Sequence, residues 1–220
     1  MPVPRLADLD AVIFDMDGVI IDSEPLHERT ATMVFSAHGM TIPPDLFEQF
    51  KGRTDRQIVR YMIANHAPGP LDEDALLEER RALYASIIDE LNPIPDVLPF
   101  IDTLSRSHRL ALATSAGRPN QRLAFDKFRL DAYFEVVITA DDITRHKPDP
   151  EPYLVTAERL GVEPARCLVF EDSVNGVRSA LDAGCQVIAI TTTSSAEALR
   201  ATGVAHVAAG FAEIRGWLMP

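Results

Sequence analysis

Five short apolar runs recur along this chain, and the segments between most of them have the length and periodicity of helices. The runs are AVIF (11–14), LALAT (110–114), VVIT (136–139), CLVF (167–170) and QVIAI (186–190). Each is apolar throughout rather than alternating, which is typical of parallel strands that are covered on both faces. The helical patterns that fit crossovers between such strands lie at residues 96–107, 119–129, 151–161 and 174–183. The sequence therefore predicts an α/β fold with a parallel sheet.

The interval between the first two runs is far longer than a crossover needs. It contains helical patterns at 25–38, 54–65 and 72–91 and no convincing strand. The economical explanation is a helical insert that leaves from the carboxyl end of the first strand, where open α/β sheets place their ligand crevice. We therefore expect an α/β core made of residues 1–22 and 93–220, with a helical cap at 23–92 that could act as a lid.

Two aspartates follow the first run, in FDMDG at residues 14–18. Strand alternation directs Asp15 and Asp17 to one side, and Gly18 allows a sharp turn after them. Two oxygens at one strand end suit a hard cation such as Mg²⁺, but a hydrogen-bonded turn that closes the strand would explain the same residues. Taken alone, this motif leaves both explanations open.

A second acidic pair, Glu171 and Asp172, follows the CLVF run. Asp172 could simply cap the next helix. The carboxyl ends of parallel strands share one edge of the sheet, however, so the two acidic pairs would meet if their strands are neighbours. This coincidence favours a metal site supplied by both strands.

Two further segments could hold a phosphoryl group at the same edge. Thr114 and Ser115 end a strand just before a helix, where hydroxyl and backbone N–H groups can bind phosphate oxygens, although helix capping alone would also explain them. Lys147 lies in a loop that Pro148 and Pro150 stiffen. Most lysines are solvated surface charges, but one held at this edge could neutralise a phosphoryl group and a nearby aspartate.

The formal net charge of −12 disfavours nucleic acid or an anionic membrane as a partner, while a basic pocket could still bind a small anion. The apolar stretches are too short to span a membrane, and the N-terminus lacks the apolar core of a signal peptide. Cys167 and Cys185 lie in or beside apolar runs without metal-binding spacing, which indicates two buried thiols. These features predict a cytoplasmic protein.

Four of these segments resemble, in the same order, the four motifs of the haloacid dehalogenase superfamily. They are FDMDGVIIDSE, the ATS run, HKPDP and FEDSVNGVRSALDAG. The resemblance covers essentially the whole chain and is closest to the β-phosphoglucomutase-like and sugar-phosphatase branch, which carries a helical cap after the first strand. It implies a Rossmann-like three-layer core with a parallel sheet, plus an inserted all-helical cap domain.

The resemblance also implies an aspartyl-phosphate mechanism. Asp15 would be the nucleophile, and Asp17 would protonate the leaving oxygen and then activate water. The dehalogenases of the superfamily lack this second aspartate, so Asp17 argues against dehalogenation. The groups expected to hold Mg²⁺ are Asp15, the backbone carbonyl of Asp17, Asp172, and Glu171 directly or through water. The groups expected to hold the transferring phosphoryl group are Thr114, Ser115 and Lys147.

The cap should decide between a phosphatase and a β-phosphoglucomutase-type phosphosugar mutase. The substrate-binding residues implied there are His27, Lys51, Gly52, Arg53 and Arg56. Taken alone, His27 also fits a partly exposed residue on the first turn of a cap helix. Mutases of this branch carry an arginine three residues after the glycine, where this chain has Asp55, and a cap lysine whose approximate counterpart is Ser86. These departures remove charges that hold a bisphosphate, which favours a phosphatase acting on a small phosphomonoester such as a sugar phosphate.

Two other classes of protein share parts of this pattern. A receiver domain also combines acidic pairs, Mg²⁺, Thr or Ser, and Lys, but it is shorter and has no insert after its first strand. A non-catalytic α/β binding protein should have lost at least one chemical residue, whereas every position above holds a competent side chain. The expected partner is a small phosphorylated metabolite, and the expected assembly is a monomer or a weak homodimer.

Overall fold

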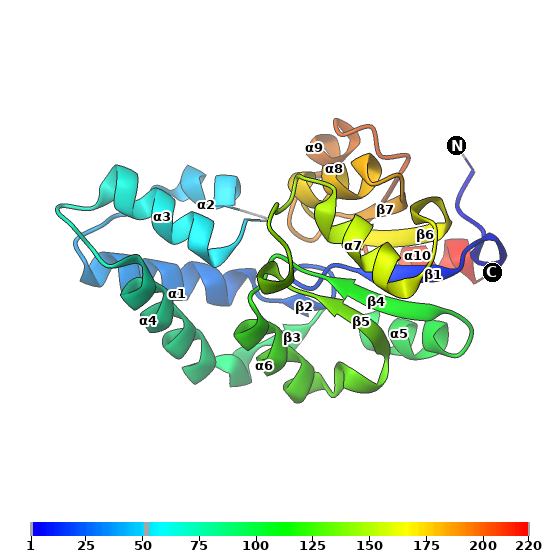
Figure 1. Cartoon of the computed structure of the whole chain (residues 1–220), viewed down its shortest axis with the longest axis horizontal. Coiled ribbons are helices and arrows are strands. Elements are labelled where there is room, and N and C mark those ends of the chain that lie inside the picture. Colours follow the sequence, from blue (N-terminus) through cyan, green and yellow to red (C-terminus); the bar gives the residue numbers. More distant parts are fainter. Residues whose placement is uncertain (1, 51–52, 220) are drawn as a thin grey trace.

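The computed structural model describes residues 2–50 and 53–219, in which six parallel strands form one sheet with helices on both faces (Figure 1). The strands are β1 (Ala11–Phe14), β4 (Arg109–Ala113), β5 (Phe134–Ile138), β6 (Cys167–Glu171), β7 (Gln186–Ile190) and β8 (His206–Ala208). Their order across the sheet is β5-β4-β1-β6-β7-β8. The first strand is therefore central, with β4 on one side and β6 on the other.

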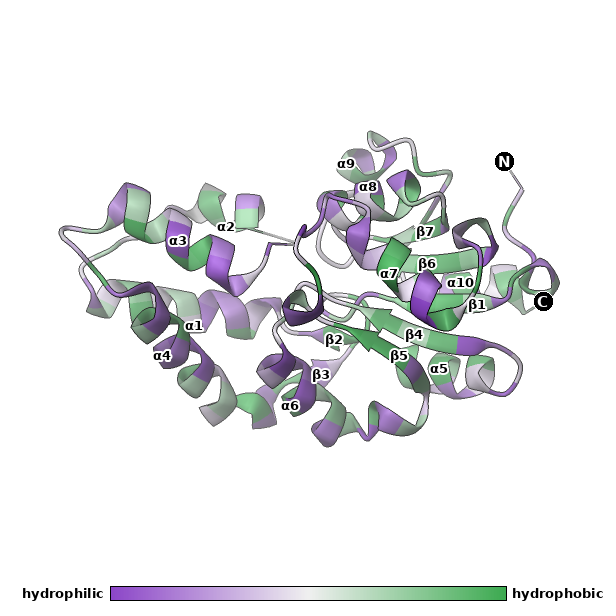
Figure 2. Cartoon of the chain, in the orientation of Figure 1, coloured by the Kyte–Doolittle hydropathy of each residue, from purple (hydrophilic) through white to green (hydrophobic). Residues whose placement is uncertain are grey.

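Alternation along β1 explains the three layers. Val12 and Phe14 point into an apolar cluster rich in aromatic rings, while Ala11 and Ile13 point into a second cluster of mostly small side chains on the other face. The helices that pack on the aromatic cluster are α5 (Val97–Ser105), α6 (Arg118–Phe128) and α10 (Phe211–Leu218). Those that pack on the other face are α7 (Glu151–Leu160), α8 (Val174–Asp182) and α9 (Ala196–Arg200). The strands are mostly apolar, as their green colour in Figure 2 shows, because both faces are covered; the exceptions include the exposed Arg109 of β4 and Glu135 of β5.

A helical segment follows β1 and lies beyond the carboxyl ends of the strands (Figure 1). Its helices are α1 (Glu24–Ala37), α2 (Pro44–Phe50), α3 (Asp55–His66) and α4 (Glu73–Ser86). They enclose an apolar cluster of their own, centred on residues such as Phe35, Val59 and Met62. At the two ends of the segment, β2 (Ile21–Asp22) and β3 (Asn92–Pro93) pair antiparallel. We propose that residues 23–92 form a cap domain on a core of residues 1–22 and 93–220, and the separate apolar cluster supports this division.

The predicted fold class is confirmed, and all five predicted strands are present within two residues of their expected bounds. The sequence patterns missed the short elements α2, α9, α10, β2, β3 and β8. The helix expected over 72–91 ends at Ser86, and a single 3-10 turn at Ile88–Glu90 follows it. The other 3-10 turns are Leu6–Asp8, Leu130–Ala132, Ala140–Asp142 and Pro164–Arg166.

Two smaller expectations concern the thiols and the membrane. Cys167 and Cys185 are both buried and free, as predicted. Within the described ranges, the structure has no helix with the length and apolar character that a membrane crossing requires.

Candidate functional site

The two acidic pairs meet at the carboxyl edge of the sheet, because β1 and β6 are direct neighbours. Phe14 pairs with Phe170, and the next residue, Asp15, donates its backbone N–H to the Phe170 carbonyl at 3.0 Å. Asp15, Glu171 and Asp172 each place a carboxylate oxygen within 4.8 Å of the others, and all three residues are buried. The sequence analysis predicted that the two acidic pairs would lie together if their strands were neighbours, and β1 and β6 are neighbours.

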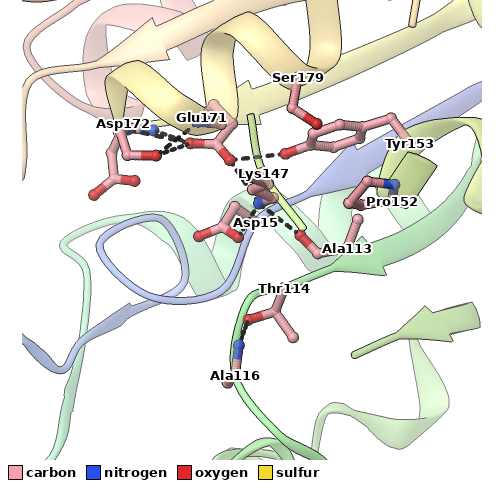
Figure 3. A network of polar contacts seen from close by, with 12 residues as sticks. Asp15, Ala113, Thr114, Ala116, Lys147, Pro152, Tyr153, Glu171, Asp172 and Ser179 are labelled. Carbon is pink, nitrogen blue, oxygen red and sulfur yellow. Dashed lines mark hydrogen bonds and ion pairs between the residues drawn. The ribbon is translucent and has the colours of Figure 1, made fainter. Parts of the chain in front are cut away.

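Lys147 reaches the same place from the loop before α7 and joins the two strands (Figure 3). Its Nζ donates to Asp15 Oδ1 at 2.6 Å, to Glu171 Oε1 at 2.7 Å and to the Ala113 carbonyl at 3.0 Å. Burial alone would lower the pKa of Lys147, but the charges of Asp15 and Glu171 outweigh burial and hold that pKa above its ordinary value. Lys147 is therefore a fixed cation whose three donors are all used.

Glu171 is fully hydrogen-bonded, and one of its partners was not expected. The Tyr153 hydroxyl, from α7, donates to Glu171 Oε1 at 2.8 Å, and the Tyr153 ring centroid lies 5.0 Å from the Lys147 ammonium. Glu171 Oε2 accepts the backbone N–H groups of Asp172 and Ser173 and the Ser173 hydroxyl, at 2.9, 3.1 and 3.1 Å. The sequence offered little sign of this role, since a tyrosine on a helix of this kind is usually a core residue.

Two glycines allow these carboxylates to approach the backbone. Gly18 has φ +75°, and a Cβ at that position would lie 1.8 Å from Asp172 Oδ2. A Cβ on Gly176 would lie 1.7 Å from Glu171 Oε1. Any side chain at either position would displace a carboxylate, so both glycines are needed for the shape of the cluster.

The cluster carries more negative charge than the described residues neutralise. Burial raises the pKa values of Asp15 and Asp172 well above their ordinary range, and Glu171 raises both further, while Lys147 opposes the shift at Asp15. Asp172 Oδ2 is buried and has no hydrogen-bond partner among the described residues. A buried carboxylate oxygen without a partner, beside two other carboxylates, is the environment that a bound divalent cation stabilises. The residues therefore fit Mg²⁺.

Asp17 lies at the edge of this cluster and outside the group of three carboxylates. Its Oδ1 accepts the Ser23 hydroxyl at 2.5 Å and lies 3.4 Å from His27 Nε2. The His27 ring stacks on Tyr84 of α4, with ring centroids 4.7 Å apart. Burial alone would lower the pKa of His27, but its hydrogen bond and attraction to Asp17 raise it. His27 thus touches the proposed acid–base residue from the first turn of α1.

A pocket opens above the cluster and is walled by both the sheet edge and the helical segment. From the core it is lined by Asp15, Asp17, Lys147, Ser115 and Asp172. From the helical segment it is lined by the candidate residues His27 and Arg53, and also by Asp55 and Arg80. The structure therefore brings most of the candidate residues to one cavity.

Some candidate residues lie elsewhere. The Thr114 hydroxyl accepts the backbone N–H of Ala116 at 3.0 Å, apart from the carboxylate cluster, and Thr114 does not line the pocket (Figure 3). Arg56 also lies away from the pocket, because its guanidinium pairs with Glu73 and Asp74 on the outer surface, at 2.6 and 2.9 Å. The predicted substrate residues Lys51 and Gly52 fall outside the described residues.

The helical segment also supplies a buried cation that the sequence analysis did not single out. Arg80 of α4 is only 4% exposed and faces the pocket, where its Nη1 lies 3.1 Å from Asp55 Oδ1. The sequence did not indicate that Arg80 is buried, because ERR within a charged helix is typical of a solvent-exposed face. Asp55 was noted only as a departure from the mutase pattern, and the structure makes it the partner of Arg80.

The sequence profile of the haloacid dehalogenase-like hydrolases matches residues 12–190 of the chain. A phosphorylated carbohydrates phosphatase of Thermotoga maritima is 36% identical over 186 residues, which cover 82% of this chain and 84% of that protein. A fructose-1-phosphate phosphatase of Escherichia coli is 31% identical over 182 residues, covering 80% and 94%. A solved HAD hydrolase of Entamoeba histolytica matches with a TM-score of 0.82 at 27% identity, covering 93% of this chain and 95% of that one.

Proposed function

The chain belongs to the haloacid dehalogenase-like hydrolase family, and from that premise we propose that it is a Mg²⁺-dependent phosphatase acting through an aspartyl-phosphate. The family resemblance predicted from the sequence is confirmed, as is the enzyme class, a phosphoric monoester hydrolase. The proposed substrate is a small phosphomonoester of the sugar-phosphate kind, and the relatives named as carbohydrate phosphatases support this proposal.

One observation carries the proposal. Asp15, at the end of the central strand, is held by a buried lysine that is itself held by Glu171, directly beside the unpartnered oxygen of Asp172. The buried ion pair with Lys147 holds Asp15 Oδ1 in a fixed position. This arrangement suits a nucleophile that must attack a phosphorus atom whose negative charge is neutralised nearby.

The groups proposed to hold Mg²⁺ are Asp15, Asp172 and the backbone carbonyl of Asp17. When bound, the cation supplies positive charge against the oxygens of the phosphoryl group. Glu171 is better suited to a supporting role, because both of its oxygens already accept hydrogen bonds from the protein. We assign it to holding Lys147 and, at most, a water-mediated contact with the metal.

The chain's own residues then account for both steps of the reaction. A carboxylate oxygen of Asp15 bonds to phosphorus, the bond to the leaving oxygen breaks, and Asp17 donates the proton that the leaving oxygen needs. Asp17 next takes a proton from a water that attacks phosphorus, the bond to Asp15 breaks, and inorganic phosphate is released. Ser23 and His27 orient Asp17 for these proton transfers.

The phosphoryl group would contact Ser115 and lie near Lys147, which both line the pocket; Lys147 would act through its charge, since its three donors are already used. Thr114 has a different proposed part: its hydroxyl holds the Ala116 N–H and so shapes the turn that presents Ser115. Because Lys147 is buried and paired with Asp15, it balances charge throughout the transfer and needs no rearrangement to do so.

The test is phosphate release by the purified protein from p-nitrophenyl phosphate and from a panel of sugar monophosphates, with Mg²⁺ or with EDTA. We expect turnover with Mg²⁺ and its loss with EDTA. Conversion of β-glucose 1-phosphate to glucose 6-phosphate that depends on a bisphosphate, with negligible phosphate release, would identify a mutase instead. Failure to turn over any phosphomonoester would support a non-catalytic binding protein.

A further inference from the structure

The loop after β7, residues 191–194, reaches the proposed metal site although none of the sequence motifs contains it. β7 pairs with β6 in the sheet, so its carboxyl end lies at the same edge as Glu171 and Asp172. Thr193 lines the pocket together with Asp172. The loop contacts two parts of the site, Asp172 and the turn at Gly18, and a threonine hydroxyl takes part in each contact.

The first contact is with Asp172. The Thr193 hydroxyl donates a hydrogen bond to the Asp172 carboxylate, and the backbone N–H of Ser194 donates to the Asp172 carbonyl at 3.2 Å. A Cβ on Gly18 would lie 1.8 Å from Asp172 Oδ2 and 2.4 Å from Thr193 Oγ1, so both oxygens lie against the same glycine. Asp172 is therefore restrained at its backbone and at its side chain, while its Oδ2 has no hydrogen-bond partner among the described residues.

The second contact is with the turn that follows Asp17. The Thr192 hydroxyl donates to the Gly18 carbonyl at 2.5 Å, and the Gly18 N–H donates to the Ile21 carbonyl at 2.7 Å. The Gly18 N–H belongs to the same planar peptide as the Asp17 carbonyl, so fixing the direction of one fixes the direction of the other. Both peptides that flank Gly18 are thus held, and one of them carries the carbonyl proposed to bind Mg²⁺.

Capping of the next helix does not account for these two hydroxyls. Ser195 is the N-cap of α9, and its own side chain accepts the Ala198 N–H at 3.2 Å. Thr192 and Thr193 instead direct their hydroxyls to residues at the ends of β1 and β6. Outer partners of this kind orient the groups that bind a metal ion, and their loss lowers the affinity for the ion.

We propose that Thr192 and Thr193 are positioning residues for the cation, which hold the Asp17–Gly18 turn and Asp172 in the arrangement that binds Mg²⁺. The inference rests on the proposed phosphatase function and adds a third strand end, that of β7, to the metal site. In this role neither threonine contacts the reacting phosphorus. Each acts through a group that is itself proposed to bind the cation.

The first experiment measures Mg²⁺ binding without substrate, by isothermal titration calorimetry. We expect Thr193→Val to raise the Kd for Mg²⁺ by about tenfold or more, because valine keeps the shape of the side chain and loses the hydroxyl. Thr193→Ser should recover most of the affinity. Thr103→Val is the control, since the Thr103 hydroxyl donates to the Pro99 carbonyl within α5. Equal Kd values for wild type and Thr193→Val, or no recovery with serine, would overturn the inference.

The second experiment separates this role from general structural damage, with p-nitrophenyl phosphate as substrate. Thr193→Val should need about tenfold more Mg²⁺ for half-maximal turnover, while kcat and KM at saturating Mg²⁺ stay within about threefold of wild type. A fall in kcat with an unchanged Mg²⁺ requirement would contradict the inference. Wild-type protein that binds Mg²⁺ but turns over no phosphomonoester would refute the phosphatase alone, because the comparison of Kd values would still stand.

A third variant keeps the test decisive if Thr193→Val does not fold. Thr192 is exposed, so Thr192→Val leaves the apolar core intact while it removes the hydrogen bond to the Gly18 carbonyl. We expect this variant to raise the Kd for Mg²⁺ by about threefold, with a melting temperature close to that of wild type. An unchanged Kd would contradict the proposal that the loop positions the groups that bind the cation.

Discussion

The two walls of the pocket differ in how completely their polar atoms are paired. On the sheet side, Lys147 uses all three donors, and Glu171 accepts five hydrogen bonds. On the facing side, Arg80 of the helical segment and Asn120 of the core helix α6 keep buried donors and an acceptor without partners among the described residues. The polar atoms of the sheet-side wall are therefore paired before a substrate binds, except for Asp172 Oδ2, which suits a cation. Those of the facing wall are not all paired.

This difference separates chemistry from recognition. A network whose hydrogen bonds are all formed holds the reacting groups in one geometry. Phosphoryl transfer depends on such positioning, because the charges that stabilise the transition state must already be in place. On the facing wall, we expect the side chains around the unpaired groups to influence which leaving group is preferred. Changes on the sheet side should therefore lower turnover of every substrate, and changes on the cap side should alter the preference among substrates.

The largest expected effect is at the proposed nucleophile. Asp15→Asn should reduce kcat by about 10⁴-fold or more for every phosphomonoester, because the amide cannot attack phosphorus. The control is Asp10→Asn, which changes the aspartate just before the other end of β1, where it pairs with Arg166. Retained Mg²⁺-dependent turnover in purified Asp15→Asn would show that Asp15 is not the nucleophile.

The next effect is at the buried lysine. Lys147→Met should reduce kcat by about 10²- to 10³-fold on p-nitrophenyl phosphate and on sugar phosphates alike, because charge on the phosphoryl group and on Asp15 loses its fixed partner. Arg109→Met, which removes an exposed cation paired with Glu135, is the matched control. A fall in kcat for only one class of substrate would show that Lys147 takes part in substrate selection, contrary to the expectation that the sheet-side wall serves the chemistry alone.

A smaller effect, and one of different character, is expected at Asn120, on the wall of the pocket that faces the carboxylate cluster. Asn120→Ala removes the unpaired acceptor and should raise KM for the preferred hydroxylated monophosphate by about tenfold, with little change in kcat. Asn65→Ala, on the exposed surface of α3, supplies the control. A fall in kcat with KM unchanged would place Asn120 on the chemical side of the pocket.

The smallest effect concerns the tyrosine that supports Glu171. Tyr153→Phe deletes one hydrogen bond of several, so we expect kcat to fall by about threefold for all substrates, with KM nearly constant. The half-buried Tyr133→Phe substitution is the comparison. A change in the ranking of substrates would show that Tyr153 acts through the pocket shape instead of through Lys147.

The sheet side was largely predictable from the sequence. Asp15 and Asp172 follow apolar runs that are typical of buried strands, and parallel strands end at a common edge. Lys147 was identifiable from its rigid proline-flanked loop together with the family resemblance. Tyr153 was not, because its role depends on the hydroxyl reaching a carboxylate that arrives from another strand.

The cap side was largely hidden. Arg56 and Arg80 both lie in charged helical patterns, and only the packing of α3 against α4 decides which one is buried. Thr114 is the reverse case, a residue that the sequence pattern selected for a role its side chain does not have in the structure. Its position matches a phosphate-binding motif, but its hydroxyl accepts a backbone N–H within a turn. The strand β8 was missed because His206–Ala208 is too short to show a period.

The aspartyl-phosphate mechanism is tested most directly by detecting phosphate on Asp15. Wild-type protein should be mixed with substrate and Mg²⁺, quenched in acid within a turnover, and digested for mass spectrometry. We expect one phosphoryl group on the peptide that contains Asp15, removable by hydroxylamine and absent from Asp15→Asn. Rapid turnover with no phosphoryl group on that peptide, or with the group on another residue, would contradict it.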